Sequence, residues 1–244
     1  MKRGFTRGSM MTSSTWIKIK GYLQYHITCI IDSKLVLITV ILWIMMGIGG
    51  GLTALSLKSN DYDLNQYQAY ETTMLTILTF SGVGLGSYLF IDSFSPEKDM
   101  GRYLIIPIDT QFKPDTLRYI SLRLLVIMGY LALYMLGAGE MSVFAMGSLH
   151  LNYVSTAGIL CGVESYILTV MYGFIGLIGY DIVHHKLWSM GPIIIFLVRY
   201  LFSDYLFLIK LGSLEQGLNY YDVLLLMMIG MISFGLECQK EHNW

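Results

Sequence analysis

The stretch DSFSPEKDMGRYLIIPIDTQFKPDTLR, residues 92–118, is charged, is punctuated by prolines, and lies between two apolar segments that are each long enough to cross a membrane. Ser95 can cap a helix that begins with a proline, and Glu97 then falls in its first turn, where the positive end of the helix dipole favours an acid. Ile106 is its natural last residue, because the proline that follows disfavours helical geometry. We therefore expect a short helix over 95–106 at the membrane face, where it docks a soluble partner.

The composition indicates an all-α integral membrane protein. The chain has 244 residues, of which 55% are hydrophobic and only 14% are charged, whereas about a quarter of the residues of a soluble domain are charged. Its mean hydropathy is +0.57. We expect residues 1–34 to form a cytoplasmic tail with an interfacial helix, and residues 35–244 to form one membrane domain with six transmembrane helices.

Residues 15–31 carry apolar side chains at a spacing of three and four, among them Trp16 and Leu23, with Lys18 and Lys20 between them. This pattern predicts an amphipathic helix that lies in the membrane interface. The alternative is a simple cytoplasmic extension of the first span. Residues 1–14 are polar and basic, and we expect them to be poorly ordered.

Six apolar runs follow, joined by polar connections that include 58–71, 138–155 and 181–188. The predicted spans are residues 35–57, 72–91, 115–137, 156–180, 189–200 and 222–236. The first is long enough to cross a bilayer as a helix. Residues 204–221 are neither clearly spanning nor clearly soluble, and could re-enter the membrane partway.

Small residues recur inside the predicted spans. GxxxG pairs, which allow close approach of helices, occur at Gly47 and Gly51 in the first span and at Gly82 and Gly86 in the second. The fourth span carries further glycines on two adjacent faces, namely Gly173, Gly176 and Gly179. We expect these glycines to serve packing.

The distribution of basic residues orients the chain. With six spans, thirteen of the sixteen Lys and Arg residues fall on the side of the termini and the 92–118 segment, against three (Lys58, Arg199 and Lys210) on the other side. Because Lys and Arg are enriched on the cytoplasmic side, we expect both termini and the 92–118 segment to be cytoplasmic.

No motif for catalysis or nucleotide binding is present. The sequence has no GxxxxGK[ST] loop, no HExxH and no GxSxG. His184 and His185 are adjacent, so on a helix they face different directions and do not have the spacing of a zinc site. The three cysteines (Cys29, Cys161 and Cys238) are isolated from one another in sequence. We expect no catalytic residue, no metal and no cofactor bound by this chain.

Three charged residues are candidates for a translocation path. Glu164 lies inside the fourth predicted span, where a carboxylate is costly unless it faces the bundle interior, a partner or a water-filled path. It could equally lie near the outer interface and hydrogen-bond locally. Arg199 and Asp204 lie near the end of the fifth span and could line the path or neutralise each other.

The arrangement resembles the transmembrane subunits of ABC-2 type ABC transporters, the permeases of the type V fold. Members of that family have an interfacial N-terminal helix, six spans and a cytoplasmic coupling helix between spans 2 and 3. The coupling helix often shows an acid, then a Gly, then apolar residues and a Pro, and here Glu97 and Gly101 are followed by apolar residues 103–106 and Pro107.

The resemblance implies a permease subunit of an ATP-driven exporter in the bacterial cytoplasmic membrane. A separate ATP-binding cassette subunit, which binds ATP and Mg²⁺, would dock on the coupling helix. The residues implied to couple the two subunits are Glu97, Lys98, Gly101, Arg102 and Tyr103. A second permease copy, identical or different, would complete the path, and amphipathic peptides or other amphiphilic toxic compounds would be exported. No nucleic acid partner is expected.

Two other functions stay open. An ion-coupled secondary transporter usually has charged residues near mid-membrane and a repeat between its halves; only Glu164 meets the first condition, and no repeat is visible. A non-transporting immunity or sensor protein of the membrane is the other alternative.

Overall fold

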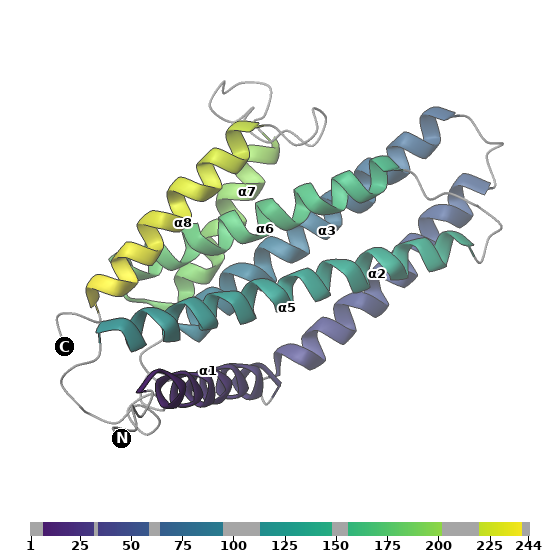
Figure 1. Ribbon diagram of the computed structural model, residues 1–244. Coiled ribbons are helices and arrows are strands. Elements are labelled where there is room, and N and C mark those ends of the chain that lie inside the picture. Colours follow the sequence, from purple (N-terminus) through teal and green to yellow (C-terminus); the bar gives the residue numbers. More distant parts are fainter. Residues whose placement is uncertain are drawn as a thin grey trace, which may run out of the picture.

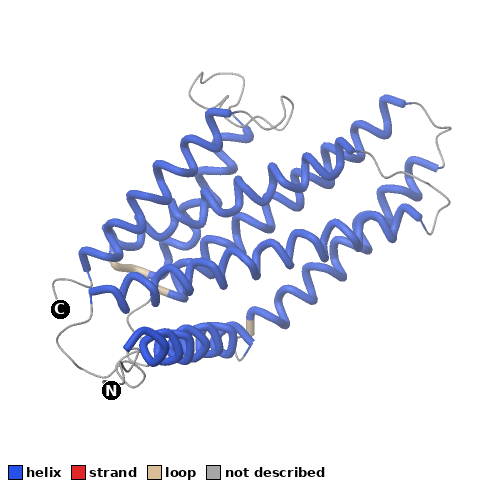
Figure 2. Tube along the Cα trace, viewed as in Figure 1, coloured by secondary structure: helices blue, strands red, loops and turns tan. Residues whose placement is uncertain are grey.

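The computed structural model describes residues 7–31, 34–58, 64–94, 113–147, 156–201 and 220–240. Almost all of these residues are helical, and none of them is in a strand (Figures 1 and 2). The helices are α1 (Arg7–Ile31), α2 (Leu35–Lys58), α3 (Leu64–Ser93), α5 (Lys113–Gly147), α6 (Thr156–Val183), the 3₁₀ helix η1 (Lys186–Met190), α7 (Gly191–Leu201) and α8 (Tyr220–Lys240). The all-α fold class is confirmed for these residues.

Three helices are long and apolar enough to cross a membrane. Their apolar windows are Leu35–Leu52, Leu117–Met141 and Ser165–Val183, which fall within or overlap the first, third and fourth predicted spans. Two shorter apolar stretches, Leu187–Val198 and Leu224–Gln239, overlap the fifth and sixth predicted spans. The predicted second span lies in α3, whose 30 residues run past it at both ends. The chain is therefore described as a membrane protein.

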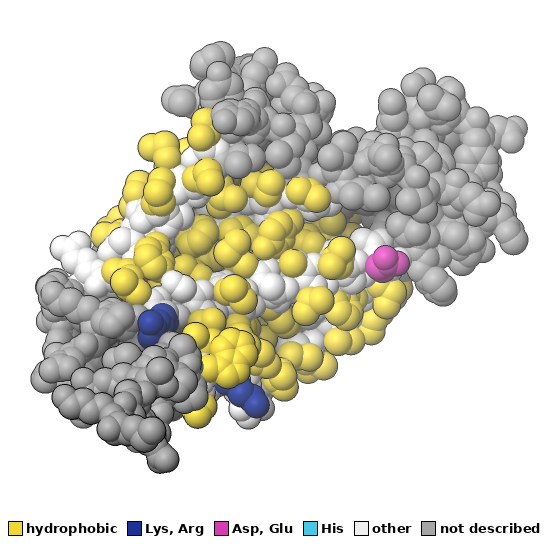
Figure 3. Space-filling view, in the orientation of Figure 1, with side chains coloured by type: hydrophobic (Ala, Val, Ile, Leu, Met, Phe, Trp, Pro, Cys, Tyr) yellow, Lys and Arg dark blue, Asp and Glu magenta, His cyan; other side chains and the backbone are white. Residues whose placement is uncertain are grey.

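The surface agrees with a membrane environment. Side chains such as Leu37, Met45 and Leu52 on α2, or Leu133 on α5, are more than half exposed although they are apolar. Hydrophobic side chains cover most of the described surface in Figure 3. Soluble monomers rarely expose a contiguous apolar area of this kind, whereas lipid tails would cover it.

Several helices are longer than the apolar runs that predicted them. The expectation that residues 1–14 are poorly ordered is wrong from Arg7 onward, because α1 begins there. The predicted polar connection 138–155 is partly helical, since α5 continues to Gly147. Likewise α3 begins at Leu64, inside the predicted loop 58–71. The physical reason is that an apolar run ends where the hydrocarbon ends, while backbone hydrogen bonds continue the helix into water.

The connection between α6 and α7 is also shorter than the predicted loop 181–188. Helix α6 reaches Val183, and η1 begins at Lys186. His185 caps η1, and its ring nitrogen Nδ1 accepts a hydrogen bond of 3.2 Å from the Leu187 N–H. His184, with φ of 54°, provides the sharp turn between the two helices. Both histidines therefore shape this connection.

The bundle is built on two helix pairs. The most extensive contact joins α3 to α6, and the next joins α2 to α5, which run side by side in Figure 1. A methyl group at Gly86 of α3 would lie only 3.1 Å from the Thr169 carbonyl oxygen of α6. The predicted close approach at Gly82 and Gly86 is thus confirmed. In the first GxxxG pair the approach is looser: a methyl at Gly47 of α2 would lie 3.9 Å from Met141 Cβ of α5, an ordinary contact, and a methyl at Gly51 meets nothing within 4 Å.

Helix α1 packs on α5 rather than continuing the line of α2. It lies at one end of the bundle and runs in a different direction from α2 (Figure 1). One face of α1 is buried through Tyr22, His26 and Ile30, while Trp16 and Ile17 are exposed. This two-faced burial is what an amphipathic helix at a membrane surface requires.

A candidate functional site where α1, α3 and α5 meet

The residues predicted to couple this chain to an ATPase all lie in a segment outside the described residues. These are Glu97, Lys98, Gly101, Arg102 and Tyr103. The structure does describe the helices on either side of this segment: α3 ends at Ser93, and α5 begins at Lys113. The surroundings of those two ends therefore define the candidate site.

The end of α3 contacts α5 and α1. The guanidinium carbon of Arg123 on α5 lies 4.8 Å from the centre of the Phe94 ring, one residue past the end of α3. Ser93 lines a cavity together with residues of α1 and α5. The end of α3 consequently lies beside α1 and α5.

Arg123 is buried between two aromatic rings. It is 5% exposed, and its guanidinium carbon lies 5.0 Å from the centre of the Tyr119 ring on the side chain one turn earlier. Its Nη2 donates a hydrogen bond of 3.2 Å to the Tyr119 hydroxyl. Cation–π contacts gain strength when they are removed from water, to about 2 kcal/mol or more. The guanidinium is therefore held in a defined position.

The position of Arg123 along α5 places it close to the start of the apolar window of that helix. It lies six residues after Leu117, where the apolar window of α5 begins, which corresponds to about 9 Å along a helix. Tyr119 contacts it, Tyr25 lies near enough to interact with its charge, and Tyr22 packs on Tyr119. Tyrosine is enriched at the membrane–water interface. The Lys and Arg side chains visible in Figure 3 gather at this end of the bundle, and an acidic side chain lies at the other end.

His26 brings a second titratable group to the site. It is 5% exposed, its ring centre is 4.6 Å from that of Tyr119, and its Nε2 has no hydrogen-bond partner. The pKa of His26 is lowered from 6.5 to about 4, mainly by burial and then by the positive charge of Arg123, while a hydrogen bond with the Tyr119 backbone acts in the opposite direction. The imidazole is therefore neutral at pH 7.

Tyr25, the residue before His26, is also shifted. Burial, followed by a hydrogen bond with Cys29, raises the pKa of Tyr25 to about 12. Its hydroxyl is thus protonated at every physiological pH, and it donates that proton to Cys29.

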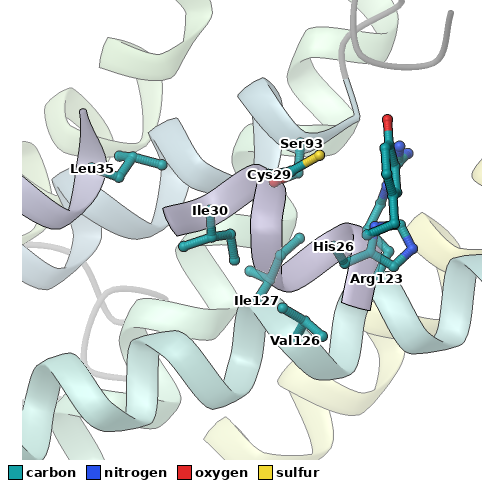
Figure 4. Close-up of a pocket in the computed structure, with 9 residues that line it drawn as sticks. His26, Cys29, Ile30, Leu35, Ser93, Arg123, Val126 and Ile127 are labelled. Atoms are coloured by element: carbon teal, nitrogen blue, oxygen red, sulfur yellow. The ribbon is translucent and has the colours of Figure 1, made fainter. Parts of the chain in front are cut away.

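These groups surround a small cavity. It is lined by Tyr25, His26, Cys29, Ile30, Leu35, Ser93, Arg123, Val126 and Ile127. In Figure 4 His26 and Arg123 lie at one end of the group and Leu35 lies at the other. The cavity volume is about 20 Å³, which is enough for about one water molecule.

The interior of the bundle holds a second set of polar contacts, which join α3 to its neighbours. Thr79 and Ser165 hydroxyls lie 2.7 Å apart between α3 and α6, and Ser81 and Tyr134 hydroxyls lie 2.7 Å apart between α3 and α5. These residues were not predicted from the sequence. The sequence shows only isolated Ser, Thr and Tyr residues within apolar runs, and the tertiary fold alone decides which of them form pairs.

The translocation-path candidates are not brought together by the described residues. Glu164 lies in α6, one residue before the apolar window that starts at Ser165, and Arg199 lies in α7. The structure describes the helical backbone of both but not their side chains, and Asp204 lies outside the described residues, as does 204–219 of the predicted re-entrant stretch. Their role in a path stays a prediction.

Metal binding finds no support in the part of the chain that the structure describes. No group of three or more His, Cys, Asp and Glu side chains there is arranged to hold an ion. His26 and Cys29 line the same cavity, yet its other polar members are a tyrosine, a serine and an arginine, which do not complete a metal site.

No family model, curated protein or solved structure matches the chain. The candidate site is thus defined by its own geometry. A buried, positively charged side chain, a neutral imidazole and a small cavity lie beside the end of α3.

Proposed function

We propose that this chain is the transmembrane subunit of an ATP-driven ABC exporter of the ABC-2 type, located in the bacterial cytoplasmic membrane with both termini in the cytoplasm. The observation that supports this most is the position of the end of α3, which comes directly before the predicted docking helix. Ser93 lines a cavity with residues of the amphipathic helix α1, and Phe94 packs on Arg123 of α5, at the end of the bundle where basic side chains are visible in Figure 3. A soluble ATPase docked there would push on α3, α5 and α1 together.

The contacts at this end suit the transfer of force. Phe94, one residue before the segment, packs on Arg123 of α5, and Tyr119 of α5 packs edge to face on Tyr22 of α1 at 5.6 Å between ring centres. A displacement of the 95–106 helix would therefore reach two other helices through close-packed aromatic groups. Close-packed interiors transmit strain, because they compress little.

The proposal includes six spans, formed by α2, α3, α5, α6, α7 with its neighbouring residues, and α8. Helix α7 has 11 residues, about 16 Å at 1.5 Å per residue, so it crosses only part of a 30 Å hydrocarbon core. In this proposal η1 extends it at one end.

The proposed substrates are amphipathic peptides or other amphiphilic toxic compounds. The described helices expose mainly apolar side chains, and hydroxyl pairs such as Thr79 with Ser165 lie between them. An amphiphile that enters sideways from the bilayer would meet apolar surface first and hydroxyl groups inside. A second copy of the permease, identical or different, would complete the path.

The decisive experiment measures coupling to an ATPase. The chain is co-expressed with the ATP-binding cassette subunit that co-purifies with it, and ATP hydrolysis and transport are measured in proteoliposomes. Glu97→Gln and Arg102→Gln are expected to leave membrane insertion intact and to uncouple the two activities, so that ATP hydrolysis no longer drives transport. Glu140→Gln is the matched control, since Glu140 is an exposed acid near the far end of the α5 apolar window.

Two results would contradict the proposal. One is transport or ligand response by the purified chain without a nucleotide-hydrolysing subunit. The other is labelling of a Ser95→Cys variant from outside intact cells by a membrane-impermeant maleimide, because the docking segment must face the cytoplasm.

A further inference from the structure

We propose that one water molecule is bound in the cavity between α1, α3 and α5, where it bridges the His26 imidazole of α1 to the Ser93 hydroxyl at the end of α3. The ligand is structural water, and its role is that of a hydrogen-bonded link between two helices. The inference does not depend on an ATPase partner. It follows from a buried acceptor, from the polar lining of the cavity and from the cavity volume.

His26 provides the acceptor. Its side chain is only 5% exposed and lines the cavity, and its Nε2 has no hydrogen-bond partner among the described residues. The other ring nitrogen, Nδ1, donates its proton to the Tyr119 backbone. In the neutral ring Nε2 therefore carries a lone pair and accepts. Buried polar atoms nearly always have a hydrogen-bond partner, so this lone pair requires a donor, and a water O–H supplies one.

The lining offers the same water further partners. The Ser93 hydroxyl of α3 can donate to the water oxygen or accept from it. A guanidinium N–H of Arg123, on the α5 side of the cavity, can add a third bond. Tyr25 is not counted, because its hydroxyl donates to Cys29. Buried waters make about three hydrogen bonds on average, and these groups provide that number.

The size of the cavity fits one water. Its volume is about 20 Å³, and a single water needs about 10–15 Å³ measured in this way. The remaining lining is apolar and includes Ile30, Leu35 and Val126. Apolar side chains offer no competing hydrogen bonds, so the polar groups alone fix the position of the water.

Such a water would tie α1 to α3. Helix α1 packs chiefly on α5, and Ser93 is the last residue of α3. Figure 4 shows Ser93 and His26 among the residues around the cavity. Water-mediated hydrogen bonds are nearly as favourable as direct ones, so the bridge would hold the end of α3 against α1 in addition to the packing of both helices on α5.

The test contrasts two sources of hydroxyl radicals on the full chain purified in dodecyl maltoside. X-ray radiolysis forms radicals from every water, bound water included, whereas laser photolysis of hydrogen peroxide forms them in bulk solvent, from which they reach exposed side chains. Oxidation of each histidine is measured by mass spectrometry. We expect radiolysis to oxidise buried His26 together with the exposed His184 and His185, and photolysis to oxidise only the exposed pair. Tyr134, which is fully buried and is not part of the lining, should be spared by both.

Variants identify the second partner. Ser93→Ala, which leaves His26 in place, is expected to lower the radiolytic oxidation of His26. His26→Phe removes the acceptor and keeps a ring, and its effect on the unfolding constant should be coupled to that of Ser93→Ala by a factor of about three or more. Ser87→Ala is the matched control: it removes a hydroxyl of the same helix that bonds the Ser189 carbonyl, and it should couple to His26→Phe by less than about twofold. If His26→Phe fails to fold, the radiolysis of Ser93→Ala still decides the question.

Three results would overturn the proposal. Sparing of His26 by both radical sources would show that no water is bound beside it. Oxidation of His26 by both sources would mean that bulk solvent reaches the ring. Unchanged radiolysis in Ser93→Ala, with additive effects in the double-mutant cycle, would rule out Ser93 as a partner and with it the bridge to α3. None of these outcomes bears on ATP-driven export, because the assays use the isolated chain.

Discussion

Gly173 of α6 lies where α6 approaches α3, and its replacement by alanine tests this helix pair. A methyl group there would lie 2.5 and 2.6 Å from two carbon atoms of the Phe90 ring of α3. Ordinary contact between carbon atoms needs about 3.5 Å or more, so the ring would have to move by about 1 Å. The Phe90 ring is fully buried and packs on Phe174, with 4.8 Å between ring centres, so it cannot move alone.

The expected cost follows from overpacking. Inserting a methyl group into a well-packed core costs about 1–3 kcal/mol. Alanine also stabilises a helix relative to glycine by up to about 1 kcal/mol, which would mask part of the clash. Gly162→Ala is therefore the matched control: it lies on the same helix, gains the same helix propensity, and its methyl would meet nothing within 4 Å. The difference between the two variants isolates the clash, at about 1–3 kcal/mol.

The measurement is equilibrium unfolding of the purified protein in mixed detergent–dodecyl sulfate micelles. Gly173→Ala should unfold at a lower dodecyl sulfate fraction than Gly162→Ala, and Phe90→Leu added to Gly173→Ala should restore part of the loss, since the smaller side chain removes the clash. Equal stability of the two alanine variants, within about 0.5 kcal/mol, would refute the close approach of α3 and α6.

Three further predictions concern polar groups. His26 has a pKa lowered from 6.5 to about 4. The unfolded chain therefore binds a proton more readily than the folded protein, so the unfolding free energy is highest above pH 6.5 and falls as the pH drops towards 4. At 1.36 kcal/mol per pKa unit the loss amounts to about 3 kcal/mol. His26→Gln should remove this pH dependence of the unfolding free energy, and an unchanged slope would contradict it. Thr79→Val and Ser165→Ala should show a coupling energy of about 0.6 and at most about 1.7 kcal/mol in a double-mutant cycle, whereas additive effects would mean that the 2.7 Å contact is not made. Trp43→Phe should lower the unfolding free energy by about 1 kcal/mol, because it removes the 3.0 Å hydrogen bond to the Tyr134 carbonyl; unchanged stability would show that this bond does not hold α2 to α5.

Part of the candidate site could be predicted from the sequence and part could not. The amphipathic pattern of 15–31 predicted a helix with one buried face, and α1 has that face. The cavity was not predicted, because its lining comes from residues about 30 to 100 positions apart, such as His26, Ser93 and Arg123. Arg123 had been assigned only to the basic side of the membrane, and nothing in its neighbours in sequence shows that Phe94 and Tyr119 enclose it.

The sequence by itself determined the fold class and the membrane character, because both follow from local properties: apolar runs of a given length, and helix formation that satisfies the backbone in hydrocarbon. It also located small residues such as Gly86 where helices could approach. Only the tertiary structure decided which glycines do so: Gly86 meets α6 closely, while Gly51 meets nothing within 4 Å. It alone placed the end of α3 beside α1 and Arg123, since the partner that a helix face receives depends on the arrangement of the whole bundle and not on the pattern of that helix.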